Sequence, residues 1–434
     1  SYKFKDELIG YGGIVNISWE NLRGEISFLL RTDIANTKKD YDEYFPNFLI
    51  LVQNIAFGEL SLYRIFGELF DLRPKYSKAF KNSGFILDGV LKAHNIINDK
   101  PVDSKVYGLV NNEEKIHPSF NNNNPNVLIT SISKKVPLIK SVMKGVRKIN
   151  KSIKVFGGDS NNLCIGKYFV DEFWEMSKID ELPVEALINF CKENKIGLII
   201  PSRDGELEYF SSVKKQLQEE GISISISDKE NILSCLDKLK FSQLKGIRSI
   251  PTSENIEDVV GNRIVVKERY GAGSDKIGIN LDKKNALAHG AKLKTPIYQP
   301  FVTGYEISVD AYISLEGNVK GILMRRRDIV VSGESQVTST FRDDKMEEEF
   351  KRTLVALNLY GHVVLQAIIS DKNEVFVIEC NPRFGGASTL SLHAGLDSFY
   401  WAYLESVKVS IKDHQFIRSQ KEFTQVRYPQ DFYL

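Results

Sequence analysis

The stretch VFVIECNPRFGG (Val375–Gly386), read together with GHVVLQAII (Gly361–Ile369) just before it, decides the fold of the second half of this chain. Two apolar runs, 363–369 and 375–380, flank the polar turn DKNE (371–374). This arrangement is the pattern of a β-hairpin. Each run also carries polar side chains, which are costly to bury unless something compensates for the loss of water.

Three of these polar side chains predict a cation site. Because side chains alternate along a strand, Glu379 and Asn381 point to the same face, and Gln366 on the neighbouring strand can reach that face. A hard cation such as Mg²⁺ takes a few carboxylate and carbonyl oxygens together with phosphate oxygens. Arg383 follows where the chain leaves the strand, and its side chain suits phosphate. The alternative at this point is an ordinary hairpin that ends in a loop, since short motifs also occur by chance.

Composition places the chain among ordinary globular proteins. Its 434 residues are 42% hydrophobic and 26% charged, and this length accommodates several domains with cores of their own. The net charge of +2, without a strongly basic block, argues against a nucleic-acid partner. The apolar run Phe48–Phe57 is too short and too polar to span a bilayer, so we expect no membrane association.

The cysteines indicate the compartment. Cys164, Cys191, Cys235 and Cys380 lie far apart and form no CxxC pair. We therefore expect reduced, mostly buried thiols rather than a disulfide framework or a zinc site. This reading places the protein in the cytoplasm.

Residues 1–120 carry the weakest signals in the chain. The apolar residues of the segment 48–72 recur at helical spacing, which predicts one or two helices. We expect an accessory or oligomerisation domain of mixed or helical structure. The polar stretch Ser119–Asn126 (SFNNNNPN) then predicts a linker.

Residues 126–228 show strands that alternate with helices. The predicted strands are 127–132, 153–156, 196–201 and 221–227, and the predicted helices are 134–150, 183–194 and 206–220. Such alternation predicts parallel βαβ units in a Rossmann-like domain. Loops after the strand ends would line a crevice near Asp159 and Asp204. A dinucleotide is not indicated, because no GxGxxG follows the first strand.

Two further segments, both after residue 228, suit acidic or phosphorylated ligands. In YGAGSDKIG (270–278), glycines allow backbone amides to approach phosphate closely, although a plain glycine-rich hairpin turn is the alternative. In MRRRDIVVSGE (324–334), Arg325 and Arg327 share a strand face and can receive a carboxylate or phosphate. A solvated arginine cluster is the alternative for this second segment.

In this order and spacing, the residues resemble the ATP-grasp superfamily, and within it the carbamoyl-phosphate-synthase-large-subunit-like group of carboxylate–amine ligases. The resemblance covers residues 127–434, and the closing run ECNPRFGGASTL is close to the pattern of that group. It implies an α/β fold (α+β lobes) in which an ATP-grasp domain, 229–434, follows a pre-ATP-grasp domain, 126–228. The lid lobe would occupy about 250–298, and its short segments predict a trimmed lid.

The resemblance also implies a role for individual residues. The residues expected to contact or cover the phosphates of ATP are Lys238, Lys267, Gly271, Gly273 and Ser274. Those expected along the adenine and ribose are Gln299, Pro300, Phe301, Val302 and Glu306. The expected ligands of Mg²⁺, with Mn²⁺ as the alternative ion, are Gln366, Glu379 and Asn381. The residues expected to supply positive charge to the reaction or to bind the acceptor carboxylate are Lys267, Arg325, Arg327 and Arg383.

The activity implied is that of an ADP-forming carbon–nitrogen ligase. A small-molecule carboxylate would be activated as an acyl phosphate and attacked by a small-molecule amine, and a homodimer is the default assembly. Two alternatives stay open: a non-catalytic ATP-binding module that acts as a switch for a partner, and a small-molecule kinase of the same fold. A Ser–His–Asp hydrolase and a dehydrogenase are disfavoured, because neither GxSxG nor GxGxxG occurs in the sequence.

Overall fold

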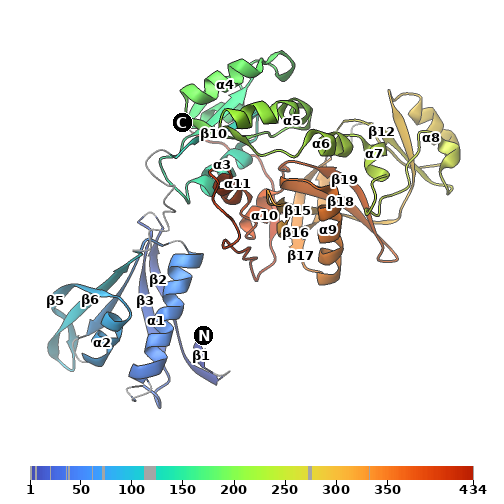
Figure 1. The fold of residues 1–434 in the computed structure, drawn as a ribbon. Helices are drawn as coiled ribbons and strands as arrows, with labels where there is room; N and C mark the ends of the chain where they lie inside the picture. The colour runs from blue at the N-terminus through green and yellow to red at the C-terminus, as the bar shows by residue number, and fades with distance from the viewer. Residues whose placement is uncertain are drawn as a thin grey trace. The chain divides into compact units, whose positions relative to one another are not determined.

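The computed structural model describes residues 2–4, 7–19, 21–35, 37, 40–60, 62–70, 74–111, 124–271, 276–331 and 333–433. The chain divides into two compact units, 1–119 and 120–434 (Figure 1). Within the described ranges, no helix has both the length and the apolar character needed to cross a membrane. All four cysteines are buried and unpaired, as the sequence predicts.

The N-terminal unit is built on a six-stranded sheet with the order β1-β2-β3-β4-β6-β5. Its strands are β1 (Tyr2–Phe4), β2 (Glu7–Ser18), β3 (Arg23–Leu30), β4 (Arg64–Phe70), β5 (Ile86–Ile97) and β6 (Lys100–Val110). Its helical segments are α1 (Phe45–Gln53), with the π-helical turns η1 (Asp40–Tyr44) and η2 (Asn54–Glu59) at its two ends, and α2 (Pro74–Asn82). All neighbouring strands are antiparallel except β3 and β4, which pair in parallel.

The prediction that the segment 48–72 is helical is wrong for its second half. Residues 45–59 are helical, but residues 64–70, which also lie in the segment with helical spacing, form the strand β4. This strand bonds to β3 on one side and to β6 on the other, and Ile65 at its start is fully buried. Long-range pairing on both sides satisfies the backbone groups, and a local apolar pattern does not reveal such pairing.

Residues 126–224 form a five-stranded parallel sheet with the order β11-β10-β7-β8-β9, which confirms the predicted βαβ arrangement. The strands are β7 (Asn126–Thr130), β8 (Val155–Asp159), β9 (Glu172–Glu175), β10 (Ile196–Ile200) and β11 (Ser223–Ile224). The helices are α3 (Val136–Val146), η3 (Ile165–Phe169), η4 (Ile179–Glu181), α4 (Val184–Glu193) and α5 (Asp204–Glu219).

Helices cover both faces of this parallel sheet. α3 and α11 (Ser398–Ser406) pack on one face, and α4 and α5 pack on the other. Burial on both faces explains why β7 and β10 read as continuous apolar runs. The strand order reverses between β7 and β10, so the loops after these two strands diverge and open a crevice at their carboxyl ends.

The remaining residues of the second unit build a six-stranded antiparallel sheet with the order β19-β18-β15-β16-β17-β20. Its strands are β15 (Gly304–Ile313), β16 (Val319–Val331), β17 (Glu334–Phe341), β18 (Gly361–Ser370), β19 (Val375–Asn381) and β20 (Thr424–Val426). The helices of this region are α6 (Lys229–Leu236), α7 (Lys238–Ser242), α9 (Asp344–Leu357), α10 (Thr389–His393) and α11.

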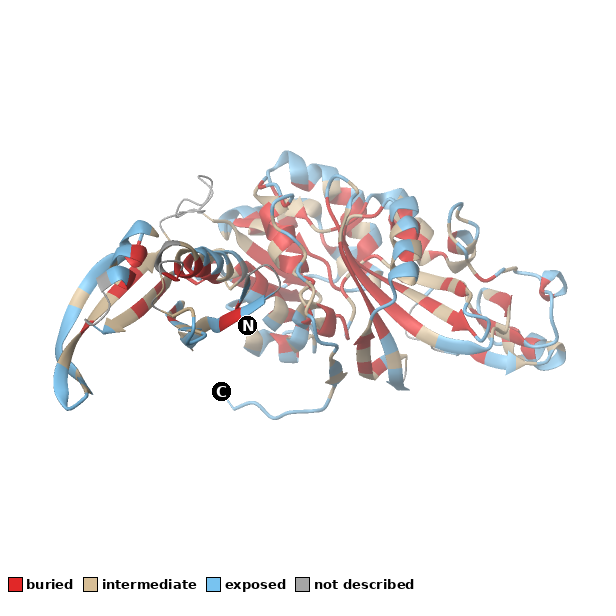
Figure 2. Cartoon of the chain, turned by 90° about the horizontal axis from the view of Figure 1, so that it is seen from below, coloured by how far each residue is buried: buried red, intermediate tan, exposed pale blue. Residues whose placement is uncertain are grey.

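The two faces of the antiparallel sheet differ in chemistry. One face is apolar and packs against α9 through Phe350 and Leu354 (Figure 1). The opposite face carries the polar residues of β15, β16, β18 and β19. Burial is strongest along the middle strands, whereas the far end of β16 toward Val331 is exposed (Figure 2). The polar face is therefore the one available for ligands.

A smaller antiparallel sheet, with the order β13-β12-β14, stands apart from the large one. It consists of β12 (Ile264–Glu268), β13 (Gly278–Leu281) and β14 (Pro296–Pro300), with the helix α8 (Lys283–Gly290) and the short turn η5 (Ile256–Asp258). Its core is small and is built from Ile256, Val259, Ile264, Val266, Ala286 and Tyr298. Residues 301–303 alone connect this sheet to β15, so the connection is short.

Candidate functional site

The β18–β19 hairpin gathers the three candidate metal ligands on the polar face of the large sheet. Gln366 lies directly opposite Glu379, and Asn381 follows two residues later on the same strand. Residues that face each other across antiparallel strands point to the same side, as do residues two apart along a strand. The backbone register therefore places the two amides and the carboxylate side by side.

These three side chains fit a hard divalent cation. Asn381 Nδ2 donates to Glu379 Oε1 at 3.3 Å, so the donor groups lie within reach of one another. One carboxylate and two amide oxygens are too few to enclose an ion, and they leave positions for phosphate oxygens and water. Mg²⁺ prefers this kind of partial oxygen set with phosphate completing its shell. These residues could therefore hold Mg²⁺.

Two lysines bring positive charge to the same place. Lys267, on β12, is buried with 8% of its surface exposed. The pKa of its ammonium is lowered to about 8, mainly by burial and also by nearby Lys238, while Glu379 and Glu306 oppose the shift. Lys238 opens α7 and donates from Nζ to the Gly271 carbonyl at 2.6 Å. Both lysines thus converge on the region of Glu379, where phosphate oxygens would need compensation.

The glycine-containing segment predicted to cover the phosphates is described only at its edges. Gly271 adopts a φ of 103°, in the left-handed region that favours glycine. Gly273 and Ser274 lie outside the residues that the structure describes. Gly271 lies beside Lys238, because the Lys238 ammonium donates a hydrogen bond to the Gly271 carbonyl.

An anchor for this segment escaped the sequence prediction. Asp237 accepts hydrogen bonds from Arg269 Nε at 2.8 Å, from Arg269 Nη2 at 2.7 Å and from the Tyr270 hydroxyl at 3.1 Å. Asp237 also caps α7 through the amides of the next turn. An aspartate directly before a helix is a recognisable N-cap signal. The sequence does not show, however, that the same carboxylate also binds Arg269, which is far away in the chain.

The structure gives different partners to Arg325 and Arg327, which lie two residues apart on β16. Arg327 lies among the candidate ligands: its Nη1 donates to Glu306 and, at 3.2 Å, to Gln366 Oε1. Its Nη2 donates to the Gly333 carbonyl at 2.6 Å. Burial raises the pKa of Glu306, and Glu379 adds to this rise, whereas Arg327 and Lys267 oppose it.

Arg325, two residues earlier, belongs to a buried network instead. Its Nε pairs with Asp310, and the two side chains are 3% and 0% exposed. Asp310 also accepts from Ser388 Oγ and from Ser391 Oγ at 2.6 Å, and it lies 3.2 Å from His362 Nε2. Burial alone would raise the pKa of Asp310, but Arg325 and His362 hold it well below its usual range.

We expect this network to be necessary for stability. Asp310→Ala should lower the free energy of unfolding by about 3–5 kcal/mol, because it leaves the Arg325 charge buried without a partner. Urea denaturation measures this change. As a control, Asp328→Ala removes an exposed aspartate of the same sheet and should cost less than about 1 kcal/mol. Equal losses for the two variants would contradict a structural role for the Asp310 network.

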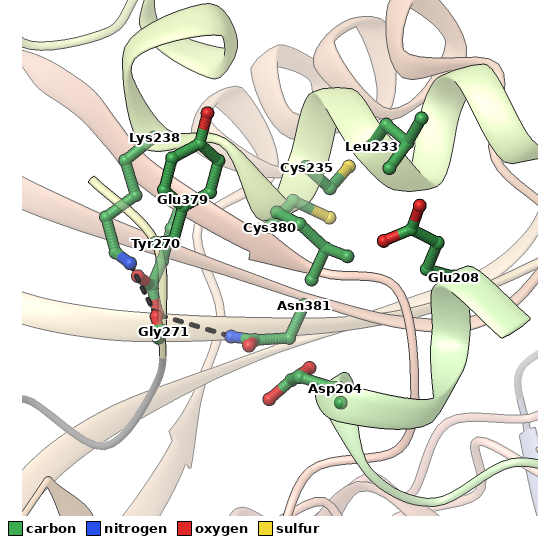
Figure 3. Close-up of a pocket in the computed structure, with 12 residues that line it drawn as sticks. Asp204, Glu208, Leu233, Cys235, Lys238, Tyr270, Gly271, Glu379, Cys380 and Asn381 are labelled. Atoms are coloured by element: carbon green, nitrogen blue, oxygen red, sulfur yellow. Dashed lines mark hydrogen bonds between the residues drawn. The ribbon is translucent and has the colours of Figure 1, made fainter. Parts of the chain in front are cut away.

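A pocket of about 280 Å³ lies beside the candidate ligands (Figure 3). Lys238, Glu379 and Asn381 line it on one side, and Asp204 of α5 lines it on another. Arg383, which follows β19, donates from Nε to Asp204 Oδ1 at 2.6 Å. The pocket therefore joins the polar face of the large sheet to the crevice at the carboxyl ends of the parallel strands.

The segment predicted to hold adenine lies at the junction of the small and large sheets. Gln299 is in β14 and donates from Nε2 to Thr252 Oγ1 at 2.7 Å. The Phe301 amide donates to the Arg263 carbonyl at 2.8 Å. Pro300 ends β14, and Val302 follows in the connection to β15. These residues thus occupy the expected place between the two lobes, and their contact with a base stays a prediction.

Comparison with known families divides the chain into three parts. Residues 234–387 match the family model described as an ATP-grasp domain, and residues 127–225 match the PylC-like N-terminal domain. Residues 1–106 match the acetyltransferase (GNAT) domain, a likeness that the sequence analysis does not predict. The carbamoyl phosphate synthase large chain of Sulfurisphaera tokodaii is 23% identical over 274 residues, which are 55% of this chain and 25% of that protein. The match thus spans a quarter of that relative.

Solved structures resemble 66–71% of this chain at low identity. The biotin carboxylase of Campylobacter jejuni in a complex with an ATP analogue has a TM-score of 0.58 at 13% identity, covering 71% of this chain and 76% of that one. The biotin carboxylase domain of Hydrogenobacter thermophilus 2-oxoglutarate carboxylase, solved with MgADP and bicarbonate, has a TM-score of 0.57 at 16% identity, with coverages of 70% and 74%. N5-carboxyaminoimidazole synthetase of Staphylococcus aureus with ADP scores 0.54 at 19% identity, with coverages of 66% and 78%. These likenesses concern the fold.

Proposed function

We propose that this chain, in which an ATP-grasp domain at residues 234–387 follows a PylC-like N-terminal domain, is an ATP-dependent ligase that joins a carboxylate to an amine through an acyl phosphate. One observation carries the proposal: Gln366, Glu379 and Asn381 share one face beside Lys238 and Lys267. A protein that used its fold only as a scaffold would have no need for three oxygen donors and two ammonium groups at one place.

The proposed mechanism asks the protein mainly for positioning and charge. When bound, Mg²⁺ would neutralise the β- and γ-phosphate oxygens. An oxygen of the carboxylate attacks the γ-phosphorus, the bond to the bridging oxygen breaks, and ADP leaves. Lys238, Lys267 and Arg383 compensate the charge on the transferred group. The amine nitrogen then attacks the acyl carbon, the bond to phosphate breaks, and the nitrogen loses a proton.

The acyl phosphate must be kept from water, because it hydrolyses readily. We propose that the side of the pocket lined by Tyr270 and Gly271 shields the phosphates from water for this purpose. The bond from Lys238 to the Gly271 carbonyl supports the proposal, because it holds this side of the pocket against a side chain that we propose to bind phosphate.

We propose that Arg327 receives the acceptor carboxylate together with Arg383. Arg325 is left out of this step because its carboxylate partner Asp310 is fully buried, whereas Glu306, the partner of Arg327, is 35% exposed. Arg327→Lys should raise the KM of the carboxylate about tenfold or more and change the KM of ATP by less than about threefold, because an ammonium cannot reproduce a planar fork of donors. Steady-state kinetics with each substrate varied in turn measures both values.

The neighbouring arginine provides the control for that measurement. Arg326 is exposed and lies over the Phe341 ring on the other face of β16, so Arg326→Lys should leave both KM values unchanged. Equal increases in the two KM values for Arg327→Lys would contradict a specific role in carboxylate binding.

Nucleotide product analysis tests the proposed activity directly. The protein is incubated with Mg-ATP and pools of carboxylates and amines, and the nucleotides and phosphate are quantified. ADP and phosphate that form only when both a carboxylate and an amine are present support the ligase. ADP formed with a single acceptor and no amine indicates a small-molecule kinase. AMP and pyrophosphate overturn the acyl-phosphate mechanism, and tight nucleotide binding without turnover favours a switch module.

A second candidate function concerns the N-terminal unit. We propose that residues 1–106, which match the acetyltransferase (GNAT) model, transfer an acyl group from a thioester to an amine. The supporting observation is that, along the described parts of β3 and β4, parallel pairing runs from Arg23 opposite Arg64 to Glu25 opposite Phe66 and stops there. Beyond that point the facing edges of the two strands carry backbone groups that an amide-containing donor can bond. Release of free thiol from acetyl-CoA with an amine pool tests this proposal.

A further inference from the structure

Arg383 connects the two domains that meet at the pocket. Its Nε donates to Asp204 Oδ1 at 2.6 Å, and its Nη2 donates to Asp204 Oδ2. The two residues are 179 positions apart in the sequence. Arg383 follows β19 of the large sheet, whereas Asp204 is the first residue of α5 in the parallel-sheet domain. A bidentate arginine–carboxylate pair fixes the plane of the guanidinium as well as its position.

Hydrogen bonds within the parallel-sheet domain hold the start of α5, where Asp204 lies. Glu206, two residues later, is fully buried and accepts hydrogen bonds from the Arg203 amide at 2.9 Å and from Ser131 Oγ at 2.6 Å. It also accepts from the Ser202 amide. These bonds tie the start of α5 to the end of β7, on the other side of the topological reversal. A carboxylate at the start of a helix is also stabilised by the helix dipole.

The backbone beside Arg383 is held by contacts within the antiparallel-sheet domain, to which Arg383 itself belongs. The Gly385 amide donates to Ser388 Oγ at 3.1 Å, and Ser388 Oγ in turn donates to the buried Asp310. The Phe384 ring packs on His362 with a centroid distance of 4.7 Å. With its backbone held in this way, Arg383 keeps freedom mainly in its long side chain, and Asp204 removes that freedom.

The pair leaves donors of Arg383 available for a ligand. A guanidinium carries five N–H groups. Asp204 engages two of them, and the Phe384 carbonyl accepts one from Nη1 at 3.0 Å. Among the described residues, these partners account for three donors, so two remain for an oxygen of a ligand. Asp204 therefore orients the guanidinium without occupying the whole of it.

We propose that Asp204 is a positioning residue that aims Arg383 at the phosphate transferred from ATP, so that the catalytic geometry of the ATP-grasp domain depends on the parallel-sheet domain. This inference rests on the proposed function for the identity of the ligand. The orientation of Arg383 itself does not depend on which substrates are used. Asp204 acts through Arg383 and does not touch the reacting atoms.

The Nε–H signal of Arg383 in ¹⁵N-labelled full-length protein tests the orientation without any turnover. Arg383→Lys assigns the signal by its disappearance. In the wild type we expect slow hydrogen exchange and a shift of the signal on saturation with Mg-AMPPNP. In Asp204→Asn we expect exchange at least about tenfold faster, because the second oxygen becomes an NH₂ donor that faces Nη2. An unchanged exchange rate, or a wild-type signal that does not respond to Mg-AMPPNP, overturns the inference.

Kinetics supply the second readout once a substrate pair is known. Asp204→Asn should lower kcat about 10- to 100-fold and change the KM of ATP by less than about threefold. The double variant with Arg383→Lys should be no slower than Arg383→Lys alone, because both changes disable the same guanidinium. A normal kcat for Asp204→Asn overturns the inference even if the exchange rate changes.

The chain offers a matched control in the same domain. Arg147 Nη2 donates to both oxygens of Asp171, at 2.7 and 2.8 Å, and this pair joins the end of α3 to the start of β9, away from the pocket. Asp171→Asn should leave the Arg383 signal and kcat unchanged. If no substrate pair is ever found, the proposed function fails, while the exchange measurement still decides whether Asp204 orients Arg383.

Discussion

Glu379→Gln is expected to lower kcat for Mg-ATP-dependent turnover on the order of 10³-fold. The change keeps the shape of the side chain but removes the only carboxylate among the three candidate ligands Gln366, Glu379 and Asn381. It also removes a negative charge that offsets the buried ammonium of Lys267. ADP formation measures the loss in rate, and titration with Mn²⁺ followed by electron paramagnetic resonance measures cation binding separately.

Glu374→Gln is the matched control for this prediction. Glu374 lies in the turn before β19 and forms an exposed ion pair with Arg248, at 2.6 Å. The substitution is chemically identical, lies close by in the sequence and is away from the polar face, so turnover and Mn²⁺ binding should be unchanged. If Glu379→Gln keeps its activity within about threefold of the wild type, Glu379 is not a ligand of the essential cation.

Lys267→Met is expected to weaken the binding of Mg-ATP about 100-fold or more and to stabilise the protein without nucleotide. The ammonium is buried on β12 and would supply charge to phosphate oxygens. In the absence of nucleotide the same charge is costly, because burial disfavours the ionised form. Isothermal titration calorimetry measures the affinity, and urea denaturation measures the stability.

The pH dependence of stability identifies the same group. The pKa of Lys267 is about 8 in the folded protein and lies below the ordinary 10.5, so between these values the unfolded chain binds more protons than the folded one. The free energy of unfolding should therefore rise with pH through this window, and the penalty should be fully present below pH 8. The difference between the two values bounds the effect at ~3 kcal/mol.

Lys267→Met should flatten this rise, and Lys292→Met should not. Lys292 is exposed in the same lobe, so its loss leaves the proton balance of the buried site unchanged. The comparison consists of urea denaturation of the three proteins at pH 7.5, 8.5 and 9.5. Parallel pH slopes for wild type and Lys267→Met would show that Lys267 is not the group that causes the rise.

Local patterns in the sequence are sufficient to predict the elements that carry the candidate site. The alternation of apolar strands with amphipathic helices in residues 126–224 predicts a parallel sheet, because only that arrangement buries apolar strands on both faces. Side-chain alternation likewise places Glu379 and Asn381 on one face of the hairpin around the DKNE turn, whereas the pairing of Gln366 with Glu379 also needs the register shift between Gln366 and Ala367. Each of these inferences depends on neighbours in the sequence.

Features that depend on distant partners could not be predicted in the same way. Residues 64–70 have a helical apolar pattern yet form β4, because β3 and β6 offer hydrogen bonds on both of its sides. Arg325 and Arg327 share a strand face and a chemistry, and the sequence cannot separate them. The tertiary structure separates them, because Arg325 pairs with Asp310 whereas Arg327 donates hydrogen bonds to Glu306 and Gln366.

The sequence by itself therefore determined the class of fold in the second unit and the set of polar groups on the β18–β19 hairpin, since both follow from periodicities of two and of about 3.6 residues. Only the tertiary structure decided which charges meet. The Arg383–Asp204 pair bridges 179 positions, and the Asp310 network gathers residues from three strands and one helix. Charges so far apart in the chain come into contact only when the sheets pack, because electrostatic pairing depends on distance in space and not on spacing along the sequence.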